Sequence, residues 1–549
     1  MVVADAENVV TTTRDLEAIY YPEDAPEQEE RYVRVVAQFC DQNGGHLPDF
    51  IARSPGRVNI IGEHIDYSLY PVLPMAIKDD VLVLVSTQAD DATGLSPPTE
   101  DEFYVEVSNS DGDKYPCRRM TFSQHEVSSE PFAGHHWSNY FLAGLRGAMQ
   151  KLMQKYGPGK SYKSMRVLVN GTVPAAGGLS SSAALVVASA LAVLRAQGED
   201  VIERKALTEL AIVSERAVGV ISGGMDQSAS VMSQRGAALF VEFYPELLAR
   251  PVYFPETKPA LKFVIAQTFV KAEKQVSAAF GYNLRVVECT LAALVMNALV
   301  NPPGTKLMVD ASPLQQSLRG FHETYFGLQK RDVAPEGDSP DRALIRQFQE
   351  LRQLVKDKLH RQPYSLEEIA QILETDLATL KATYLRGYPT ECKDFKLRDR
   401  ALHVWGEAQR VVSFMELLKN PPADHGEPTV GDKYNAELGK LLLESQDSCR
   451  DSFECSVSQI DQLVQLGRIG GSYGGRLTGA GWGGCTIHLV PEDKVASVKE
   501  SMMNVYYGVG DNFKAVLDTA MVVTRPGTGS TIYEPSDLLR AKVRASKPL

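Results

Sequence analysis

The stretch GTVPAAGGLSSSAALVVASALAVL, from Gly171 to Leu194, constrains the fold of this chain more than any other. The strand-like residues before it, MRVLVNG, end near Asn170, and a loop of small residues follows. We expect an apolar helix to begin at the serines, which can cap its first turn. Because a helix N-terminus presents unpaired N–H groups and a positive dipole end, the loop is a candidate phosphate cradle. A tight turn with a serine cap is the alternative.

A second informative stretch, GRVNIIGEHIDY, covers residues 56–67. Its apolar positions Val58, Ile60 and Ile61 are typical of a strand. Four polar side chains crowd the residues after Gly62, and this cluster has no apolar face on which to pack. We therefore expect these side chains to hydrogen-bond to a group that the strand itself does not supply.

A third stretch, GGMDQSAS at residues 223–230, places Asp226 directly after two glycines and a methionine. Taken alone, an aspartate in this position caps a helix more often than it acts as a catalytic base. Its role therefore depends on the residues that surround it in the fold.

Two glycine-containing stretches fail as nucleotide motifs. Residues 159–161 resemble the end of a P-loop, but Gln154 stands where that motif requires glycine. GAGWGG, residues 479–484, has the GxGxxG spacing but is followed by the apolar run CTIHLV, whereas a dinucleotide fingerprint opens a helix. For GAGWGG, a glycine loop that approaches a ligand closely remains an alternative interpretation.

The composition is that of an ordinary globular protein, with 44% hydrophobic and 23% charged residues. A length of 549 residues favours two or more domains. The net charge of −12 argues against a nucleic-acid surface, because phosphate backbones select basic faces. An anionic substrate would need a local positive site within this acidic field.

The seven cysteines are odd in number and form no CxxC pair or zinc-type spacing. Scattered thiols of this kind are typical of a reducing compartment. The first thirty residues are acidic and lack a basic stretch followed by an apolar core, so we expect no secretory signal. The longest apolar run, Ala183–Leu194, is about half of a roughly 20-residue membrane span. We therefore predict a cytoplasmic protein with no membrane partner.

Strand-like and helix-like segments alternate along the chain without an internal repeat. Short apolar runs predict strands at residues 80–86, 104–110, 165–171 and 263–268. Apolar residues at helical spacing predict helices at residues 137–157 and 282–300. Stretches rich in proline, glycine and aspartate predict exposed loops near residues 87–101, 331–341 and 420–432. This mixture favours an α+β or mixed α/β enzyme in two lobes.

In this order, the motifs resemble those of the galactokinases of the GHMP kinase superfamily. GRVNIIGEHIDY is similar to the N-terminal signature, PAAGGLSSSAA to the phosphate-binding loop and GGRLTGAGWGGCTI to the C-terminal glycine motif. SERAVG, GGMDQ, YNLRVVEC and RALHVWGEAQRV are also similar, so the resemblance spans roughly residues 30–525. The likeness extends to fungal-type galactokinases and to N-acetylgalactosamine kinases, which share Trp482 and the EHIDY form of the first motif.

The resemblance implies an α+β fold, the two-lobed GHMP kinase fold, with its active site in the cleft between the lobes. The N-terminal lobe, residues 1–222, would carry a mixed sheet and two of the motifs. These are GRVNIIGEHIDY, here called the sugar motif, and PAAGGLSSSAA, here called the phosphate loop. The C-terminal lobe, residues 223–549, would pack helices on an antiparallel sheet that contains the GAGWGG turn. Insertions near residues 302–345 and 420–432 depart from shorter galactokinases and could serve regulation or partner binding.

By this resemblance, the polar cluster after Gly62 is a hexose-recognition site. A sugar with several hydroxyls needs donors and acceptors at fixed angles. The implied substrate-binding residues are Arg57, Glu63, His64, Asp66, Gly223, Asp226 and Tyr282. A capped turn with solvent-facing charges is the alternative for the cluster.

The implied catalytic residues are Asp226 and Arg57. Asp226 would take the proton from the anomeric C1 hydroxyl as that oxygen attacks the γ-phosphate. Arg57 would keep Asp226 charged and steady the transferring phosphoryl group. A structural ion pair is compatible with this role.

The resemblance also implies ATP as co-substrate and Mg²⁺ as the metal that bridges its phosphates. The implied ATP-binding residues are Trp137, Gly177, Gly178, Leu179, Ser180, Ser181 and Ser182. Ser182 and Glu215 match the metal ligands of the family. An exposed helix carboxylate is the alternative for Glu215, and a core aromatic is the alternative for Trp137.

Three functions stay open on the sequence. The first is an ATP-dependent galactokinase of galactose catabolism, and the second is a kinase for N-acetylgalactosamine, which differs in the room near C2. The third is a silent sensor of galactose and ATP that binds a transcriptional repressor. Such sensors lack two residues after the serines of the phosphate loop, whereas this chain keeps GLSSSAA, Asp226 and Arg57, which favours catalysis. A regulatory protein partner cannot be read from the sequence.

Overall fold

A seven-stranded mixed sheet forms the framework of the N-terminal part, in the order β1-β15-β2-β3-β6-β4-β5. The pairs β1–β15 and β4–β6 are parallel, and the other neighbouring pairs are antiparallel. Its strands are β1 (Thr11–Thr13), β2 (Phe50–Ile61), β3 (Leu73–Ser86), β4 (Glu102–Asn109), β5 (Arg118–Ser123), β6 (Met165–Gly171) and β15 (Thr531–Tyr533). The mixed sheet expected for the N-terminal lobe is confirmed.

The structure is a computed structural model of the chain. It describes residues 8–87, 99, 101–127, 132, 134, 136–157, 160–174, 177–219, 221–270, 281–329, 339–385, 392–421, 431–508 and 517–545. Most of the three stretches predicted as loops, near residues 87–101, 331–341 and 420–432, lie outside the described residues.

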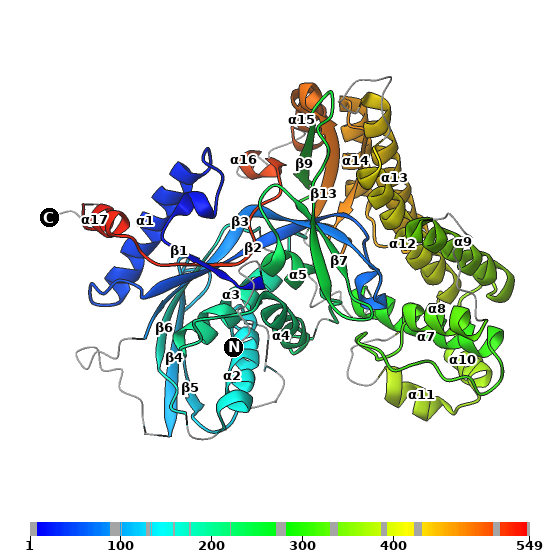
Figure 1. The fold of residues 1–549 in the computed structure, drawn as a ribbon, viewed down its shortest axis with the longest axis horizontal. Coiled ribbons are helices and arrows are strands. Elements are labelled where there is room, and N and C mark those ends of the chain that lie inside the picture. Colours follow the sequence, from blue (N-terminus) through cyan, green and yellow to red (C-terminus); the bar gives the residue numbers. More distant parts are fainter. Residues whose placement is uncertain are drawn as a thin grey trace.

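Helices cover both faces of the mixed sheet, because alternate residues of a strand point to opposite sides (Figure 1). Ile51, Leu82 and Leu84 pack with residues of α1 (Ala25–Gln42) and α17 (Asp537–Ala545). Helices α3 (Ser181–Ala196) and α5 (Met225–Met232) pack on the other face, and α2 (Asn139–Tyr156) and α4 (Arg204–Arg216) pack on α3. The helix expected to begin at the serines is therefore α3, and it is buried along most of its length.

A four-stranded antiparallel sheet in the order β12-β13-β9-β14 forms the second framework. Its strands are β9 (Leu261–Gln267), β12 (Gly474–Thr478), β13 (Cys485–Pro491) and β14 (Met521–Thr524). Helices α13 (Asp432–Asp451), α14 (Ser458–Gly470) and α15 (Val495–Met502) pack on it. The GAGWGG residues form the turn between β12 and β13, so a strand follows them as the sequence predicts.

A group of helices lies at the end of the molecule opposite α1 and α17 (Figure 1). It comprises α7 (Tyr282–Val300), α8 (Leu318–Leu328), α9 (Pro340–Lys358), α10 (Leu366–Ile372), α11 (Leu377–Tyr384) and α12 (Leu397–Lys419). Helix α7 has the bounds that the sequence predicts. Among the described residues it alone is long and apolar enough to cross a membrane, but 72% of its apolar window is buried inside the protein, as in a core helix. Helix α8 and the first residues of α9 fall within the insertion near residues 302–345.

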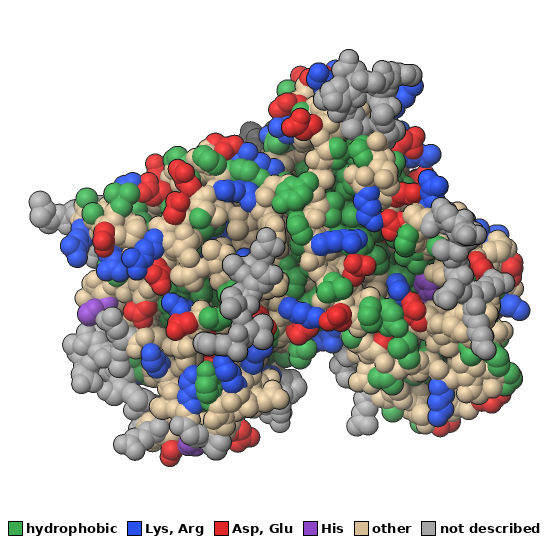
Figure 2. All heavy atoms as spheres, viewed as in Figure 1, with side chains coloured by type: hydrophobic (Ala, Val, Ile, Leu, Met, Phe, Trp, Pro, Cys, Tyr) green, Lys and Arg blue, Asp and Glu red, His purple; other side chains and the backbone are tan. Residues whose placement is uncertain are grey.

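The C-terminal segment returns to the N-terminal sheet, where β15 pairs with both β1 and β2. A lobe boundary at residue 222 stays a prediction. The remaining elements are η2 (Leu16–Ala18), η3 (Asp66–Ser68), β7 (Ala238–Glu242), β8 (Leu248–Val252), β10 (Tyr364–Ser365), β11 (Asp394–Phe395), η6 (Glu492–Lys494), η7 (Met503–Tyr507) and α16 (Leu517–Ala520). On the face drawn in Figure 2, acidic and basic side chains are interspersed.

Candidate active site

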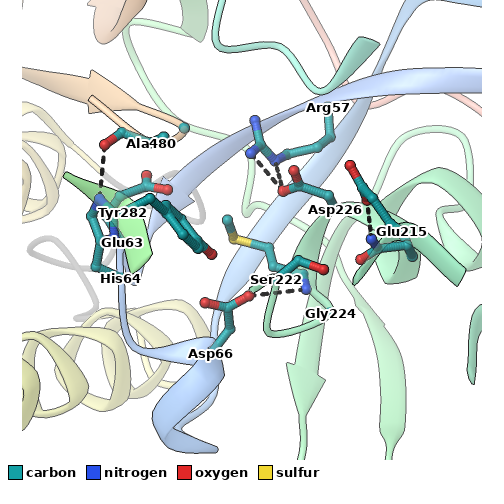
Figure 3. A pocket seen from close by; sticks show the side chains of 13 residues that line it. Arg57, Glu63, His64, Asp66, Glu215, Ser222, Gly224, Asp226, Tyr282 and Ala480 are labelled. Carbon is teal, nitrogen blue, oxygen red and sulfur yellow. Dashed lines mark hydrogen bonds and ion pairs between the residues drawn. The ribbon is translucent and has the colours of Figure 1, made fainter. Parts of the chain in front are cut away.

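One cavity gathers residues that lie far apart in the sequence (Figure 3). It is lined by Arg57, Glu63, His64, Asp66, Glu215, Ser222, Gly224, Met225, Asp226, Gln227, Tyr282, Gly479 and Ala480. Every residue predicted to bind the sugar lines this cavity except Gly223, whose two sequence neighbours do. The structure therefore brings the polar cluster after Gly62 to Asp226, at the place where both sheets contribute to one site.

Arg57 pairs with Asp226 on one wall of the cavity. Its Nε and Nη2 lie 2.7 Å and 2.5 Å from Asp226 Oδ1. Asp226 lies in the first turn of α5, where the helix dipole favours negative charge. Burial alone would lower the pKa of Arg57, but the charge of Asp226 raises it above its ordinary value. The guanidinium therefore stays charged although its side chain is only 2% exposed.

The same arginine also contacts the candidate phosphate loop. Arg57 donates from Nη1 to the carbonyl oxygen of Gly178 (2.8 Å) and from its backbone N–H to that of Leu179 (3.1 Å). The pairing of β2 with β3 is irregular between Pro55 and Arg57, a local distortion that re-aims side chains. One cation therefore joins the candidate base to the loop ahead of α3.

The loop ahead of α3 has the features of a ligand cradle. Ser180, the residue before the helix, adopts a left-handed φ of +60°, and its hydroxyl is buried without a hydrogen-bond partner. A Cβ on Gly479 would lie 2.3 Å from the carbonyl oxygen of Gly178, so the glycine turn packs directly on this loop. The loop and the first helical turn hold the predicted ATP-binding residues Gly177, Gly178, Leu179, Ser180, Ser181 and Ser182.

Trp137, the remaining residue predicted to bind ATP, lies outside the cavity lining, just before α2. Its indole Nε1 donates to the carbonyl oxygen of Pro116 (3.1 Å). Its ring lies 5.9 Å from that of Tyr115, measured between centroids. A contact with adenine stays a prediction for this residue.

Asp66 connects the sugar motif to the start of α5 through a hydrogen bond. Its Oδ2 accepts a hydrogen bond from the backbone N–H of Met225 (3.2 Å). A Cβ on Gly223 would lie 2.4 Å from both Asp66 Cγ and the backbone nitrogen of Tyr67, so only glycine permits this approach. Burial, together with the nearby charge of Asp226, raises the pKa of Asp66 to about 6.

Glu63 has one oxygen engaged by protein and one directed elsewhere. Its Oε2 accepts from Asn59 Nδ2 (3.2 Å) and from Arg476 Nη2 (3.0 Å). Its Oε1 makes no hydrogen bond to any described residue. Burial raises the pKa of Glu63 above its ordinary value, against the opposing charge of Arg476. The free oxygen is an acceptor for a ligand hydroxyl.

Two further hydroxyls offer polar contacts in the cavity. The Tyr282 hydroxyl makes no hydrogen bond within the described part of the chain, and Ser222 Oγ is buried without a partner. Burial raises the pKa of Tyr282 well above its ordinary value, so this hydroxyl keeps its proton and can donate. These groups and Glu63 Oε1 offer both donors and acceptors to a polyhydroxylated ligand.

His64 is a neutral imidazole in the wall of the cavity. Burial lowers its pKa to about 3. Its Nε2 lies 2.8 Å from the carbonyl oxygen of Ala480 and therefore donates, which leaves Nδ1 to accept from the Tyr67 hydroxyl at 3.1 Å. Its ring packs among those of Tyr67, Tyr282, Phe453 and Trp482. Both ring nitrogens are thus engaged within the protein, and the ring shapes the wall.

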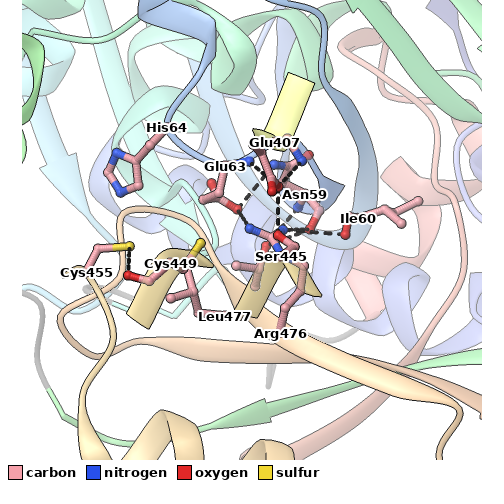
Figure 4. A network of polar contacts seen from close by, with 12 residues as sticks. Asn59, Ile60, Glu63, His64, Glu407, Ser445, Cys449, Cys455, Arg476 and Leu477 are labelled. Atoms are coloured by element: carbon pink, nitrogen blue, oxygen red, sulfur yellow. Dashed lines mark hydrogen bonds and ion pairs between the residues drawn. The ribbon is translucent and has the colours of Figure 1, made fainter. Parts of the chain in front are cut away.

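A buried polar network holds the sugar motif from behind (Figure 4). Glu407 on α12 accepts three hydrogen bonds at Oε1, from Gly62 N (2.9 Å), Glu63 N (3.3 Å) and Ser445 Oγ (2.7 Å), and a fourth at Oε2 from Arg410 Nε (2.8 Å). His403, one helical turn earlier, lies with Nε2 at 3.0 Å from the Glu63 carbonyl oxygen. Burial would raise the pKa of Glu407, but the neighbouring guanidinium groups lower it to about 2. The carboxylate is therefore ionised and fully satisfied.

The predicted metal ligands are oxygen donors, which suit a hard cation. Glu215 lines the cavity and accepts a hydrogen bond from Gln227 Nε2. Gln227 Oε1 is buried without a partner, so a second oxygen beside Glu215 is available to a ligand. Among the described residues, no group of three or more His, Cys, Asp or Glu could hold a metal ion. A Mg²⁺ ion at Ser182 and Glu215 would therefore depend on phosphate oxygens, as this ion commonly does.

Sequence reasoning missed two residues that line the cavity and five that hold its walls in place from behind. They are Asn59, Ser222, Gln227, His403, Glu407, Ser445 and Arg476. One signal could have found two of them, because His403 and Glu407 are polar residues spaced i and i+4 on a helix whose buried residues are mostly apolar. Such a pair inside a buried helix indicates a specific polar partner.

Comparisons with known proteins find matches along most of this chain. Family models match the galactokinase galactose-binding signature at residues 37–87, the GHMP kinases N terminal domain at residues 139–234 and the GHMP kinases C terminal domain at residues 433–508. Galactokinase of Schizosaccharomyces pombe is 34% identical over 540 residues, covering 96% of this chain and 99% of that protein. Galactokinase of Saccharomyces cerevisiae is 36% identical over 502 residues, covering 89% of this chain and 92% of that protein.

A solved structure shares the fold. The crystal structure of Lactococcus lactis galactokinase complexed with galactose has a TM-score of 0.58 at 22% identity, covering 91% of this chain and 99% of that one. The fold expected from the sequence, with its mixed and antiparallel sheets, is therefore confirmed. Together with the near full-length relatives, these findings show that this chain belongs to the galactokinase family of the GHMP kinases.

Proposed function

We propose that this chain transfers the γ-phosphoryl group of ATP to the anomeric C1 hydroxyl of galactose, giving galactose 1-phosphate and ADP. The observation that carries the proposal is the position of Arg57, which contacts both Asp226 and the loop ahead of α3. Phosphoryl transfer needs this combination of a base, an anion-binding loop and a cation between them. The curated relatives from Schizosaccharomyces pombe, Saccharomyces cerevisiae and Dictyostelium discoideum are each named galactokinase, which supports galactose as the sugar.

Asp226 acts as the general base in this proposal. The C1 hydroxyl gives its proton to Asp226 while its oxygen forms a bond to the γ-phosphorus, and the bond from that phosphorus to the bridging oxygen of ADP breaks. Arg57 favours the charged carboxylate and meets the negative charge that develops on the transferring group. Because hydrogen bonds to Asp226 and to the Gly178 carbonyl oxygen already hold the Arg57 guanidinium, the group needs little reorganisation during the step.

Sugar recognition falls to the groups that lack protein partners. Glu63 Oε1 accepts a sugar hydroxyl, while the hydroxyls of Tyr282 and Ser222 donate or accept. Asp66 adds a second carboxylate, held in place by the backbone of Met225. A site built to hydrogen-bond each hydroxyl discriminates strongly, since a missing partner leaves a buried polar group unpaired.

ATP would lie with its phosphates at the N-terminus of α3. The unpaired Ser180 hydroxyl and the first-turn N–H groups of that helix would bind them. Mg²⁺ bound by Ser182 and Glu215 would neutralise phosphate charge. The remaining oxygen of Gln227 would support this ligand set.

Sugar binding requires the cavity to widen. It encloses about 20 Å³, the space of about one water molecule. A hexose is larger, so the walls must move apart to admit it. Closure of the two lobes afterwards would exclude water, which otherwise hydrolyses ATP in place of the sugar hydroxyl.

A cytoplasmic location is part of the proposal. All seven cysteines are free, and five of them are buried. Free thiols in this number persist most readily in a reducing compartment.

The test is ADP release by the purified chain with ATP and Mg²⁺, offering galactose and N-acetylgalactosamine in separate assays. Turnover with galactose well above that with the acetamido sugar is the expected result. The reverse preference would assign the chain to the N-acetylgalactosamine kinases. Galactose binding that depends on ATP, without turnover of either sugar, would assign it to the sensors.

A further inference from the structure

A second cavity lies apart from the active site, between the N-terminal residues around η2 and the segment that follows β14. It measures about 410 Å³, within the range of roughly 300–1,000 Å³ that is typical of small-molecule sites. Strands β2, β3 and β9 also contribute to its lining. It shares no lining residue with the active-site cavity. A ligand here would therefore contact none of the residues that line the active-site cavity.

The lining is cationic, although the whole chain carries a net charge of −12. Four basic residues line the cavity against one carboxylate, Asp24; they are Arg53, Lys78, Lys262 and Arg525. Lys78, Lys262 and Arg525 have side chains 38–42% exposed and pair with carboxylates at the surface. Exposed ion pairs of this kind contribute little to stability, so a bound anion can replace the carboxylates as the partner of these basic side chains.

Two largely buried residues that line this cavity each carry a polar atom with no hydrogen-bond partner among the described residues. Arg53 is 1% exposed and uses Nε for Asp80 and Nη1 for the carbonyl oxygens of Thr528 and Gly529. Its Nη2 makes no hydrogen bond to any described residue. Thr524 is 8% exposed, and its hydroxyl likewise has no partner in the described part of the chain. Buried polar groups are normally satisfied, so these two point to a ligand that accepts hydrogen bonds.

An apolar wall adjoins these donors. Phe254 and Phe263 line the cavity and pack edge to face, with ring centroids 5.4 Å apart. Leu261 extends this surface. The wall can cover the carbon ring of a ligand whose charged end lies at Arg53.

We propose that this cavity binds a small phosphate monoester, with the phosphate at Arg53 and Thr524 and the ring of the molecule against Phe254. Arg53 suits phosphate because its Nη2, which no described residue engages, belongs to a permanently charged guanidinium and carries two N–H donors. Sugar phosphates and nucleoside monophosphates share this chemistry. The cavity therefore accepts a metabolite of either kind.

The cavity wall continues to the helix that carries Asp226. The backbone N–H of Gly529 donates to the Ser233 carbonyl oxygen (2.8 Å), and Ser530 Oγ donates to that of Ser230 (2.9 Å). Ser230 belongs to α5, and Arg53 lies on β2 four residues before Arg57. A ligand that shifts the segment 525–530 therefore shifts α5. On the proposed function, ligand binding here changes kcat.

Calorimetry on the full chain tests the site. The active site is first filled with galactose and a non-hydrolysable ATP analogue, and the chain is then titrated with galactose 1-phosphate, with AMP and with inorganic phosphate. We expect at least one organic phosphate to bind about tenfold more tightly than inorganic phosphate, because the apolar wall adds to the phosphate contacts. If galactose 1-phosphate binds more tightly than AMP, the ligand is a sugar phosphate; if AMP binds more tightly, the ligand is a nucleoside monophosphate.

Variants separate this cavity from other anion sites. The double variant Lys78→Gln with Arg525→Gln and the single variant Thr524→Val should each weaken that binding about tenfold and remove the ligand's effect on kcat. Lys205→Gln is the matched control, since Lys205 is 42% exposed, pairs with Glu246 and lies outside the lining. Absence of organic phosphate binding to the filled enzyme, or equal binding by the variants, overturns the proposal. Failure of galactose or the ATP analogue to bind in the first step contradicts the proposed function instead.

Discussion

Glu407 accepts a hydrogen bond from the backbone N–H of Gly62 at 2.9 Å, although 345 residues separate the two in the chain. The glycine directly precedes the polar cluster of the sugar motif, and the glutamate lies on α12 in the distant helical group. Glu407 does not line the active-site cavity. Its contribution is to fix the backbone from which Glu63 and His64 project.

The variant Glu407→Gln should therefore impair sugar binding more than nucleotide binding. Glutamine keeps the volume but removes the charge that pairs with Arg410 at 2.8 Å. We expect a loss of about 3 kcal/mol in the free energy of unfolding and a rise of roughly tenfold in KM for galactose. Steady-state kinetics with galactose and ATP varied in turn measures the change in KM for each substrate.

The matched control for this variant is Glu416→Gln on the same helix, where a partly exposed glutamate pairs with Arg342. It should leave both KM values and the stability nearly unchanged. An equal rise in KM for ATP and for galactose in Glu407→Gln would show a general loss of packing instead of a positioned sugar motif.

The raised pKa of Asp66 makes stability depend on pH. The pKa is about 6 in the folded chain against an ordinary 3.8, so between these values the folded state holds a proton that the unfolded state has released. The free energy of unfolding contributed by this group therefore falls as the pH rises through that window. Asp66→Asn should gain roughly 2–3 kcal/mol over the wild type at pH 7.5 and little at pH 4. Urea unfolding at the two pH values gives the comparison, and an equal difference at both would contradict the assignment.

Gly479 tests the contact between the glycine turn and the phosphate loop. Its φ is +87°, and an added Cβ would lie 2.3 Å from the Gly178 carbonyl oxygen. We expect Gly479→Ala to displace the loop and to weaken ATP binding by tenfold or more. Gly198→Ala is the control, since Gly198 has a similar φ of +93° but no atom within 4 Å. The control should cost about 1 kcal/mol of stability and leave ATP affinity unchanged; equal effects of both would assign the loss to backbone strain alone.

The parts of the site that the sequence predicts are those built from neighbouring residues. The strand at Val58, Ile60 and Ile61, the start of α3 and the bounds of α7 follow from local apolar periodicity, and all are confirmed. The pairing of Arg57 with Asp226 joins residues 169 positions apart, so it came from the family resemblance and not from local pattern.

Long-range polar contacts leave no such local trace. Arg476 reaches Glu63 from 413 residues away, and no period or spacing connects them. Their pairing depends on how β12 packs against β2, which only the assembled core determines. The closeness of Gly223 to Asp66 is of the same kind, because the need for a missing Cβ becomes visible only when both backbones are placed.

The central claim is that Asp226, held by Arg57, is the base of the phosphoryl transfer. The most direct measurement is kcat of Asp226→Asn together with its calorimetric affinity for galactose, beside the control Asp537→Asn, which changes a first-turn aspartate of α17. We expect kcat of Asp226→Asn to fall about 100-fold or more with galactose affinity nearly retained, and we expect no change in the control. Undiminished turnover in Asp226→Asn would contradict the central claim.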